Sequence, residues 1–337
     1  MIREGIQAVV SGQDLSEAEA ATVMTEIMDG ESTPAQIAAF ITGLRMKGET
    51  VEEITGCARI MRDKATPIHT PEGSTPVDTA GTGGDGARTF NISTTAAFVA
   101  AGAGVMMAKH GNRAASSECG SADLLEALGV NIAPDPELVA TAVRDVGIGF
   151  LFAAALHGAM RHAIGPRREI GIRTIFNILG PLTNPARSKH QLVGIFDGSL
   201  TATMATVLGN LGAKRAFVVH GSDGLDEITT TGPTTVSELR HGQVVTYAIH
   251  PDDFGLPTNA PDELKGGDAA YNAVLTRRLL QGEDLPQRGI VLLNAAAAIA
   301  AGTEDKTIAD CLPLAQEALD SGRGWAKLEQ LRELTPR

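Results

Sequence analysis

The stretch that decides the fold reads PVDTAGTGGDGARTFNISTT and spans residues 76–95. Its start, residues 76–79, predicts a short strand that runs into the glycine cluster of residues 81–86. Residues 91–95 then open a helix that runs through Ala103. Glycines let the backbone come close to a ligand, and the free N–H groups at a helix start bind anions. The stretch fits a phosphate cradle and, equally, a tight strand-to-helix turn with Ser93 or Thr94 as its N-cap.

Residues 1–65, upstream of this stretch, carry the start signals of short helices. Ser16 with Glu19 and Thr50 with Glu53 fit the capping box. Apolar residues at helical spacing predict one buried stripe, with Gly48 as the stop: Ile37, Phe40, Ile41 and Leu44. We expect a small all-helical domain over residues 1–68.

A proline-rich linker, Thr66 to Pro76, precedes a change to the pattern of an α/β domain over residues 69–337. Apolar runs there alternate with segments of helical period: Gly104 to Ala108, Gly147 to Phe152, Leu192 to Phe196 and Ala216 to Val219. Residues 243–249 look like an antiparallel addition, and residues 268–335 return to helices. The predicted fold class is α/β, a small helical domain plus a larger domain whose central mixed, mostly parallel sheet is flanked by helices.

The composition of the chain argues against some classes of binding partner. The chain has 337 residues, 43% of them hydrophobic, and a formal net charge of −12. This charge argues against a sequence-independent nucleic-acid binder, because such proteins need a basic face. No apolar stretch is long enough for a membrane span, and Cys57, Cys119 and Cys311 show no metal-ligand spacing. We therefore expect a cytoplasmic protein with a small-molecule partner.

Anion donors are dense between residues 109 and 123, after the apolar strand expected to end at Ala108. Lys109 would supply a point charge, Asn112 could orient a planar ligand, and three serines with their amides would surround a pyrophosphate: Ser116, Ser117 and Ser121. His110 fits a structural hydrogen-bond donor equally well.

Asp226 and Glu227 follow the apolar run that ends at Val219. Adjacent carboxylates on a loop after a strand suit Mg²⁺, which takes few protein carboxylates together with waters and substrate phosphates. A solvated acidic turn is the common alternative for such a pair.

Arginines 167, 168 and 173 lie close together further upstream. A guanidinium binds a carboxylate through two parallel N–H bonds, so one of these arginines could select an aromatic acid. Spacing alone does not choose among them, and a surface salt bridge is the default for each.

Taken together and in order, five motifs resemble the anthranilate phosphoribosyltransferase family: GTGGD at 81–85, NIST at 91–94, KHGNRAASS at 109–117, RTIFNILGPLTNPA at 173–186 and LDE at 225–227. The glycine cluster and the lysine-led loop are shared in outline with pyrimidine nucleoside phosphorylases and indicate the superfamily fold, whereas the run at 173–186 indicates the enzyme. The resemblance implies transfer of the 5-phosphoribosyl group of phosphoribosyl pyrophosphate (PRPP) to the amine of anthranilate. This reaction is the second step of tryptophan biosynthesis from chorismate.

The resemblance also implies site residues. For PRPP they are Gly81, Gly84, Asp85, Thr89, Asn91, Ile92, Ser93, Thr94, Lys109, Asn112, Ser116, Ser117 and Ser121. For anthranilate they are Gly81, Asn112 and Arg167, with His110 and His157 lining the approach. Two Mg²⁺ ions would be held by Ser93, Asp226 and Glu227, and the catalytic residues would be Lys109, Asp226 and Glu227.

The resemblance further implies a homodimer through the helical domain, which a segment near 165–185 would join. The chain departs from the family pattern at two places in the expected acceptor channel: Gly158 follows His157 where proline is frequent, and Pro166 precedes Arg167 where valine is common. The alternatives are a pyrimidine nucleoside phosphorylase, for which the chain is short, and a non-catalytic nucleic-acid-binding relative, which would need basic grooves.

Overall fold

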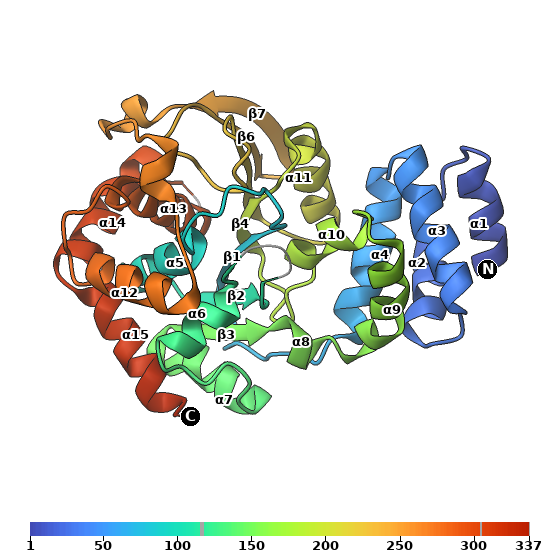
Figure 1. Ribbon diagram of the computed structural model, residues 1–337, viewed down its shortest axis with the longest axis horizontal. Helices are drawn as coiled ribbons and strands as arrows, with labels where there is room; N and C mark the ends of the chain where they lie inside the picture. The colour runs from blue at the N-terminus through green and yellow to red at the C-terminus, as the bar shows by residue number, and fades with distance from the viewer. Residues whose placement is uncertain (115–117, 304, 337) are drawn as a thin grey trace.

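A computed structural model describes residues 1–114, 118–303 and 305–336 and shows a helical bundle beside a larger α/β body (Figure 1). The bundle contains α1 (Ile2–Val10), α2 (Glu17–Met28), α3 (Pro34–Lys47) and α4 (Val51–Lys64). The predicted capping boxes are present, since Ser16 and Thr50 accept the N–H groups of Glu19 and Glu53, whose side chains accept in return. Gly48, at φ +90°, ends α3. The helices predicted for residues 1–65 are therefore confirmed.

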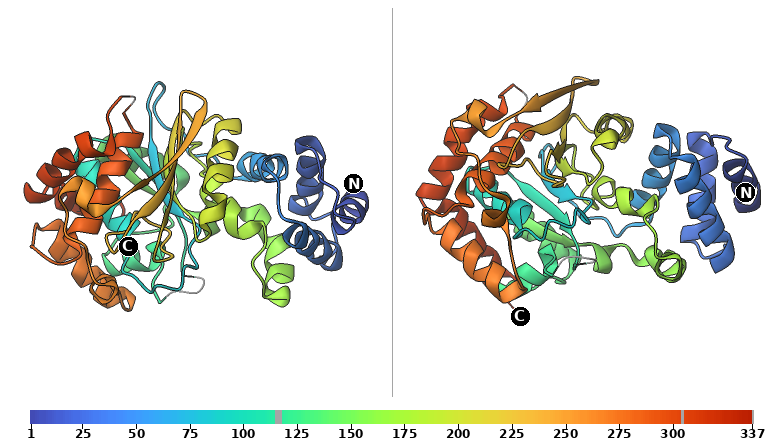
Figure 2. Two further views of the ribbon diagram at one scale, coloured as in Figure 1. Left: turned by 90° about the horizontal axis from the view of Figure 1, so that it is seen from above. Right: turned by 45° about the horizontal axis from the view of Figure 1, so that its top comes forward.

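The buried stripe predicted for α3 is also confirmed, because Ile37, Phe40, Ile41 and Leu44 are all buried. Two helices from the middle of the chain add to this core: α9 (Arg161–Ile170) packs against α3, and α10 (Phe176–Leu179) packs against α4. Figure 2 shows this segment lying between the bundle and the α/β body. The apolar core of the bundle continues through this segment onto one face of the sheet.

The sheet has seven strands in the order β3-β2-β1-β4-β5-β6-β7 in the described part of the chain. Their bounds are β1 (Val77–Gly81), β2 (Met107–Gly111), β3 (Ile148–Phe152), β4 (His190–Gly194), β5 (Arg215–Gly221), β6 (Thr234–Arg240) and β7 (Gln243–Ile249). The first five run parallel, and β6 and β7 are antiparallel to their neighbours. The predicted mixed, mostly parallel sheet is therefore confirmed.

Helices cover both faces of the sheet, which is why the residues of its parallel strands are mostly buried. The remaining helices are α5 (Ile92–Gly102), α6 (Ser121–Ala127), α7 (Pro136–Thr141), α8 (Ala153–Leu156), α11 (Thr201–Asn210), α12 (Ala269–Leu280), α13 (Arg288–Ala301), α14 (Ile308–Asp320) and α15 (Arg323–Leu334). Leu192 faces the core that contains α5 and α13, whereas its neighbour Val193 faces α11 and the bundle. No helix among the described residues is long and apolar enough to cross a membrane.

Two details of the sheet differ from the sequence-based expectation. The strand expected at Gly104 to Ala108 begins at Met107 and ends at Gly111, so Lys109 and His110 lie within β2 rather than on a loop after it. Both polar residues are accommodated there because they have buried partners: the side chain of Lys109 bonds Thr79, and the backbone N–H of His110 bonds Asp78. Strand β6 was not predicted from the sequence. The two residues that follow it, His241 and Gly242, both have positive φ and form the turn between β6 and β7.

Candidate active site

The candidate site lies where the order of the strands reverses. The chain runs from β1 outward to β2 and β3, and then returns to the other side of β1 with β4. In such sheets ligands bind outside the carboxyl ends of the strands at this switch point. Gly81 and Gly194, the last residues of β1 and β4, pair with each other there, and Thr82 donates its N–H to the carbonyl of Gly194 at 3.0 Å.

These two strand ends must be glycine because Asp226 packs directly on them. A Cβ added to Gly194 would lie 1.5 Å from the backbone oxygen of Asp226, and one added to Gly81 would lie 2.3 Å from its carboxylate oxygen Oδ2. The loop after β5 therefore reaches over the ends of β1 and β4. The glycine cluster and the acidic pair, which are far apart in sequence, form one site.

Asp226 and Glu227 each bind the backbone of a different predicted motif. Asp226 Oδ2 accepts the N–H of Gly83 at 2.7 Å, and Glu227 Oε1 accepts the N–H of Ser93 at 3.1 Å. Burial, and then repulsion by neighbouring carboxylates, raises the pKa of Asp226 to about 6 and the pKa of Glu227 to about 8. Both carboxylates are thus held by backbone donors from other segments, which favours a structured site over a solvated acidic turn.

Lys109 connects β2 to both motifs. Its side chain is buried, and Nζ donates to the carbonyl of Thr79, to Thr79 Oγ1 at 3.3 Å and to Ser93 Oγ at 3.4 Å. Burial lowers the pKa of its ammonium group, and the charges of Asp78, Glu227 and Asp226 oppose that shift. The cation is thus held at the base of the site, next to the acidic pair.

The donor set fits a hard divalent cation. Two carboxylates and the hydroxyl of Ser93 supply oxygen ligands of the kind that Mg²⁺ prefers, and a bound cation would offset the burial and the carboxylate repulsion that raise the pKa values of the pair. The described part of the chain contains no group of three or more His, Cys, Asp or Glu side chains that could hold a metal ion. Any ion at Asp226 and Glu227 would complete its shell with water and substrate oxygens.

Helix α5 begins at Ile92, so neither Ser93 nor Thr94 is its N-cap. Asn91 occupies the N-cap position, but its side chain does not cap the helix. Instead its Nδ2 donates to the Cys119 carbonyl at 3.1 Å, and its Oδ1 accepts from Asn272 at 3.0 Å. The N-cap predicted at Ser93 or Thr94 is therefore wrong. Sequence reasoning did not find Asn272, which comes from the distant α12.

The structure describes most of the other residues that were predicted to bind PRPP. Ile92 and Thr94 are buried in the first turn of α5, and Thr89 pairs with Lys265 in an isolated bridge. Ser121 starts α6 and donates to the carbonyl of the exposed Asn112 at 3.2 Å. Asp85 accepts the N–H of Ala87 within the glycine loop. Ser116 and Ser117 lie outside the described residues.

His110 and His157 form a buried pair whose Nε2 atoms lie 3.2 Å apart. Burial is the main cause that lowers their pKa values, to about 3 for His110 and about 4 for His157. Both rings are therefore neutral near pH 7, and one Nε2–H donates to the other Nε2. Asp78, which sequence reasoning did not single out, accepts the backbone N–H of His110 at 2.9 Å.

The structure distinguishes between the three candidate arginines, which their spacing in the sequence could not do. Arg167, on α9, lies with its guanidinium carbon 5.1 Å from the ring centroid of Phe176, and burial lowers its pKa. It forms no ion pair with the described residues, so a surface salt bridge is the wrong interpretation for it. Arg168 is exposed, and Arg173 donates to the carbonyl of Gly84. Hydrogen bonds within the described ranges do not join Arg167 to the cluster of Ser93, Lys109 and the acidic pair.

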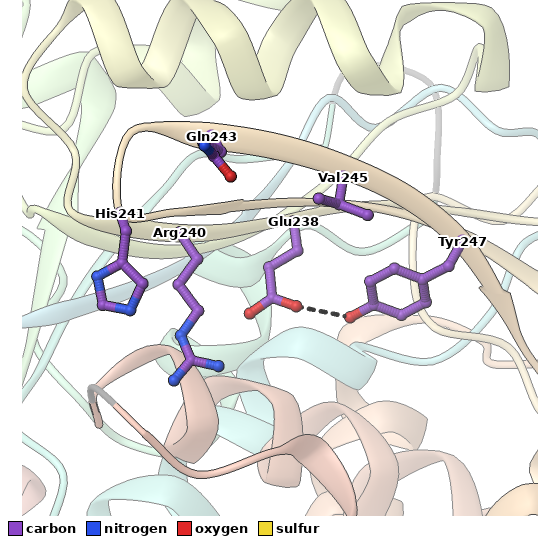
Figure 3. A pocket seen from close by; sticks show the side chains of 6 residues that line it. All are labelled: Glu238, Arg240, His241, Gln243, Val245 and Tyr247. Carbon is purple, nitrogen blue, oxygen red and sulfur yellow. Dashed lines mark hydrogen bonds between the residues drawn. The ribbon is translucent and has the colours of Figure 1, made fainter.

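A hollow of about 330 Å³ lies elsewhere, along the β6–β7 hairpin (Figure 3). Glu238, Arg240 and Tyr247 line it, and Tyr247 donates to Glu238 at 3.0 Å. Arg240 pairs with Arg215 at the amino end of β5, whereas the acidic pair follows the carboxyl end of that strand. The hollow contains none of the candidate site residues.

Comparison with known proteins shows to which class of protein the chain belongs. Residues 3–65 match the helical bundle domain of a glycosyl transferase family, and residues 73–325 match the α/β domain of a glycosyl transferase family. The fold and these matches make the chain a glycosyl transferase with both of these domains.

Curated relatives and solved structures narrow this class. The chain is 57% identical to the anthranilate phosphoribosyltransferase of Moorella thermoacetica over 98% of this chain and 97% of that protein, and 56% identical to that of Geobacter sulfurreducens over 99% of both. It resembles the crystal structure of the Thermus thermophilus enzyme with a TM-score of 0.93 and 44% identity, covering 98% of each chain. It also resembles the Saccharomyces cerevisiae enzyme in complex with PRPP and Mg, with a TM-score of 0.88 and 26% identity over 99% of this chain and 97% of that one. The chain belongs to the anthranilate phosphoribosyltransferase family.

Proposed function

We propose that the chain transfers the 5-phosphoribosyl group of PRPP to the amine of anthranilate and releases pyrophosphate, as the second step of tryptophan biosynthesis from chorismate. The observation that carries the proposal is the convergence of Lys109, Ser93 and the acidic pair under the glycine loop at the switch point of the sheet. This arrangement suits a substrate with several phosphates. The high identity to relatives with this activity supports the choice of acceptor.

In this proposal the glycine loop and the start of α5 hold the ribose and the diphosphate of PRPP, as the resemblance implies for those residues. Lys109, Asn112 and the serines 116, 117 and 121 complete the shell. Asp226, Glu227 and Ser93 would hold two Mg²⁺ ions, which supply positive charge at the pyrophosphate when bound. The solved structure of the yeast relative is a complex with PRPP and Mg, which supports the metal but not the number of ions.

The reaction breaks the bond between ribose C1 and the pyrophosphate oxygen, forms a bond from C1 to the amine nitrogen and releases one amine proton. Negative charge develops on the leaving group, so preorganised donors belong there. Lys109 is such a donor, fixed by Thr79 and Ser93, and the loop N–H groups add to it. The amine is neutral near pH 7, so positioning supplies much of the rate and no catalytic base is assigned.

Arg167 would bind the carboxylate of anthranilate. It is half-buried and forms no ion pair with the described residues, and a partly desolvated guanidinium gains from a bidentate carboxylate partner. Gly81 and Asn112 would complete the acceptor site, and the neutral His110–His157 pair would line its approach without taking up a proton.

The test is the loss of anthranilate fluorescence when PRPP and Mg²⁺ are added to purified protein, with each component omitted in turn. Loss that needs all three supports the transferase, whereas fluorescence that persists in the complete mixture would refute it. Phosphate-dependent cleavage of thymidine would then favour the nucleoside phosphorylase alternative, and nucleic-acid binding would favour the non-catalytic relative.

Three further statements stay predictions: the domain boundary at residues 68 and 69 with the joining segment near 165–185, the homodimer, and the cytoplasmic location. Free and buried cysteines in the described structure support a reducing compartment. Sedimentation of the purified protein would test the homodimer.

A further inference from the structure

Arg173 lies in the loop between α9 and α10 and reaches across to the glycine loop. Its Nη2 donates to the carbonyl oxygen of Gly84. The guanidinium carbon also lies 4.0 Å from the ring centroid of Phe196, which follows β4. One side chain from the segment beside the helical bundle thus contacts two segments at the rim of the candidate site.

The glycine loop needs such an anchor because its own backbone is permissive. Gly83, Gly84 and Gly86 all have positive φ values of 63°, 76° and 76°. Glycine populates both signs of φ at little cost, so peptide groups between glycines reorient easily. On one side the loop is held by the bond from the Gly83 N–H to Asp226, and at its base by bonds of Thr82. Arg173 holds it further along, at Gly84.

The peptide between Gly84 and Asp85 is planar and trans, so its carbonyl and its N–H point in opposite directions. Fixing the Gly84 carbonyl toward Arg173 therefore fixes the Asp85 N–H on the opposite side of the loop. If this peptide turned over, a loop that presents N–H groups to an anion would present a carbonyl oxygen instead, which repels it.

We infer that Arg173 is a positioning residue for PRPP, which fixes the orientation of the glycine loop by donating to Gly84 while it stacks on Phe196. The inference rests on the proposed function. It assigns to Arg173 a role distinct from that of Arg167: Arg167 selects the acceptor, and Arg173 prepares the loop for the donor substrate.

The chemistry of the side chain supports this role. A planar guanidinium can stack on an aromatic face and donate in its own plane at the same time, whereas an ammonium group has no plane to stack. The approach is also close, since a Cβ on Gly84 would lie 3.3 Å from Arg173 Nη2. Glycine at position 84 thus serves both the backbone conformation and the arginine contact.

The experiment measures steady-state KM and kcat for both substrates in wild type, Arg173→Ala, Arg173→Lys and the control Arg168→Ala, which removes an exposed neighbouring cation. Arg173→Ala should raise the KM for PRPP about tenfold, the cost of one charge-assisted hydrogen bond, and change the KM for anthranilate less than about twofold. Arg173→Lys should recover little, free guanidinium ion should partly rescue Arg173→Ala, and Arg168→Ala should match wild type. An unchanged KM for PRPP in Arg173→Ala would overturn the inference.

Phe196→Leu tests the same contact without removing the cation, should Arg173→Ala fold poorly. It keeps the donor to Gly84, loses the stacking surface and should raise the KM for PRPP by a smaller factor, about threefold. An equal rise in both KM values would mean general loosening of the site and would count against the inference. If wild type binds PRPP with Mg²⁺ in calorimetry but does not consume anthranilate, the acceptor assignment fails, and weaker PRPP binding by Arg173→Ala would still support the role of Arg173.

Discussion

Substituting Gly81 by alanine tests the packing of Asp226 on the end of β1. The added Cβ would lie 2.3 Å from Asp226 Oδ2, and real Cβ atoms essentially never come closer than 3.0 Å to such neighbours. The carboxylate must therefore move by about 0.7 Å, the difference between these two distances. Gly81 itself does not have a positive φ, so alanine fits its backbone conformation and the strain falls on the carboxylate.

This displacement has a predictable cost. Asp226 Oδ2 accepts the Gly83 N–H at 2.7 Å, and a hydrogen bond to a charged group contributes about 2 kcal/mol, or roughly thirtyfold in an equilibrium constant. Mg²⁺ demands near-ideal oxygen distances, so a carboxylate moved by this much should also bind the ion less well. We expect kcat/KM for PRPP to fall roughly thirtyfold and the half-saturating Mg²⁺ concentration to rise.

The assay is the initial rate of fluorescence loss at varied PRPP and Mg²⁺, with the unfolding midpoint in denaturant as a check on folding. Gly289→Ala is the matched control, because its added Cβ would lie 3.9 Å from Thr230, an ordinary contact far along the chain on α13. A Gly81→Ala enzyme with the Mg²⁺ dependence of wild type would refute the reasoning. A rise confined to the KM for anthranilate would instead indicate that Gly81 acts only through the acceptor.

Three further outcomes are expected. Lys109→Met should lower turnover at least about a hundredfold while the protein still unfolds cooperatively, because it removes a preorganised cation from the leaving group; turnover like that of wild type would exclude this role. Arg167→Ala should raise the KM for anthranilate about tenfold and leave the KM for PRPP nearly unchanged, and a parallel rise in both would contradict its assignment. The pKa values of His110 and His157, about 3 and about 4, lie below the ordinary value of 6.5, so the unfolded chain takes up protons first and stability is lost as pH falls from 6.5 toward 4. Denaturant unfolding at pH 7 and pH 4.5 should show a smaller loss in His157→Gln than in wild type, and an equal loss would contradict the buried neutral pair.

The helical bundle could be predicted because its signals are local. A capping box needs only two residues three positions apart, as at Thr50 and Glu53, and the stripe on α3 needs only helical spacing. The bounds of β2 could not be predicted in the same way. Lys109 and His110 read as loop residues because they are polar, and their partners, Thr79 and Asp78, lie about thirty residues earlier.

The residue types of the site could be interpreted from the sequence, but the contacts between these residues could not be predicted from it. Glycines, serines and an acidic pair predict a phosphate and metal site by their chemistry alone. No sequence pattern indicates that Asp226 packs on Gly194, that Asn272 bonds Asn91, or that Arg173 reaches Gly84. These contacts join segments that only the strand order brings together, so sequence reasoning names the components of the site without their assembly.

The charges of the site explain how an acidic protein can use a polyanionic substrate. The chain carries a net charge of −12, and Asp226 and Glu227 lie beside the one lysine that donates to Ser93 in the described structure. Without a cation these carboxylates repel a pyrophosphate group, and Asp226 also repels Glu227, which adds to the burial that raises the pKa of Glu227. A divalent cation removes both repulsions at once, so it should bind more tightly when the substrate phosphates are present. Because such coupling is reciprocal, PRPP must gain affinity by the same factor when the cation is present, and the acidic pair thereby makes the site selective for the metal-bound substrate.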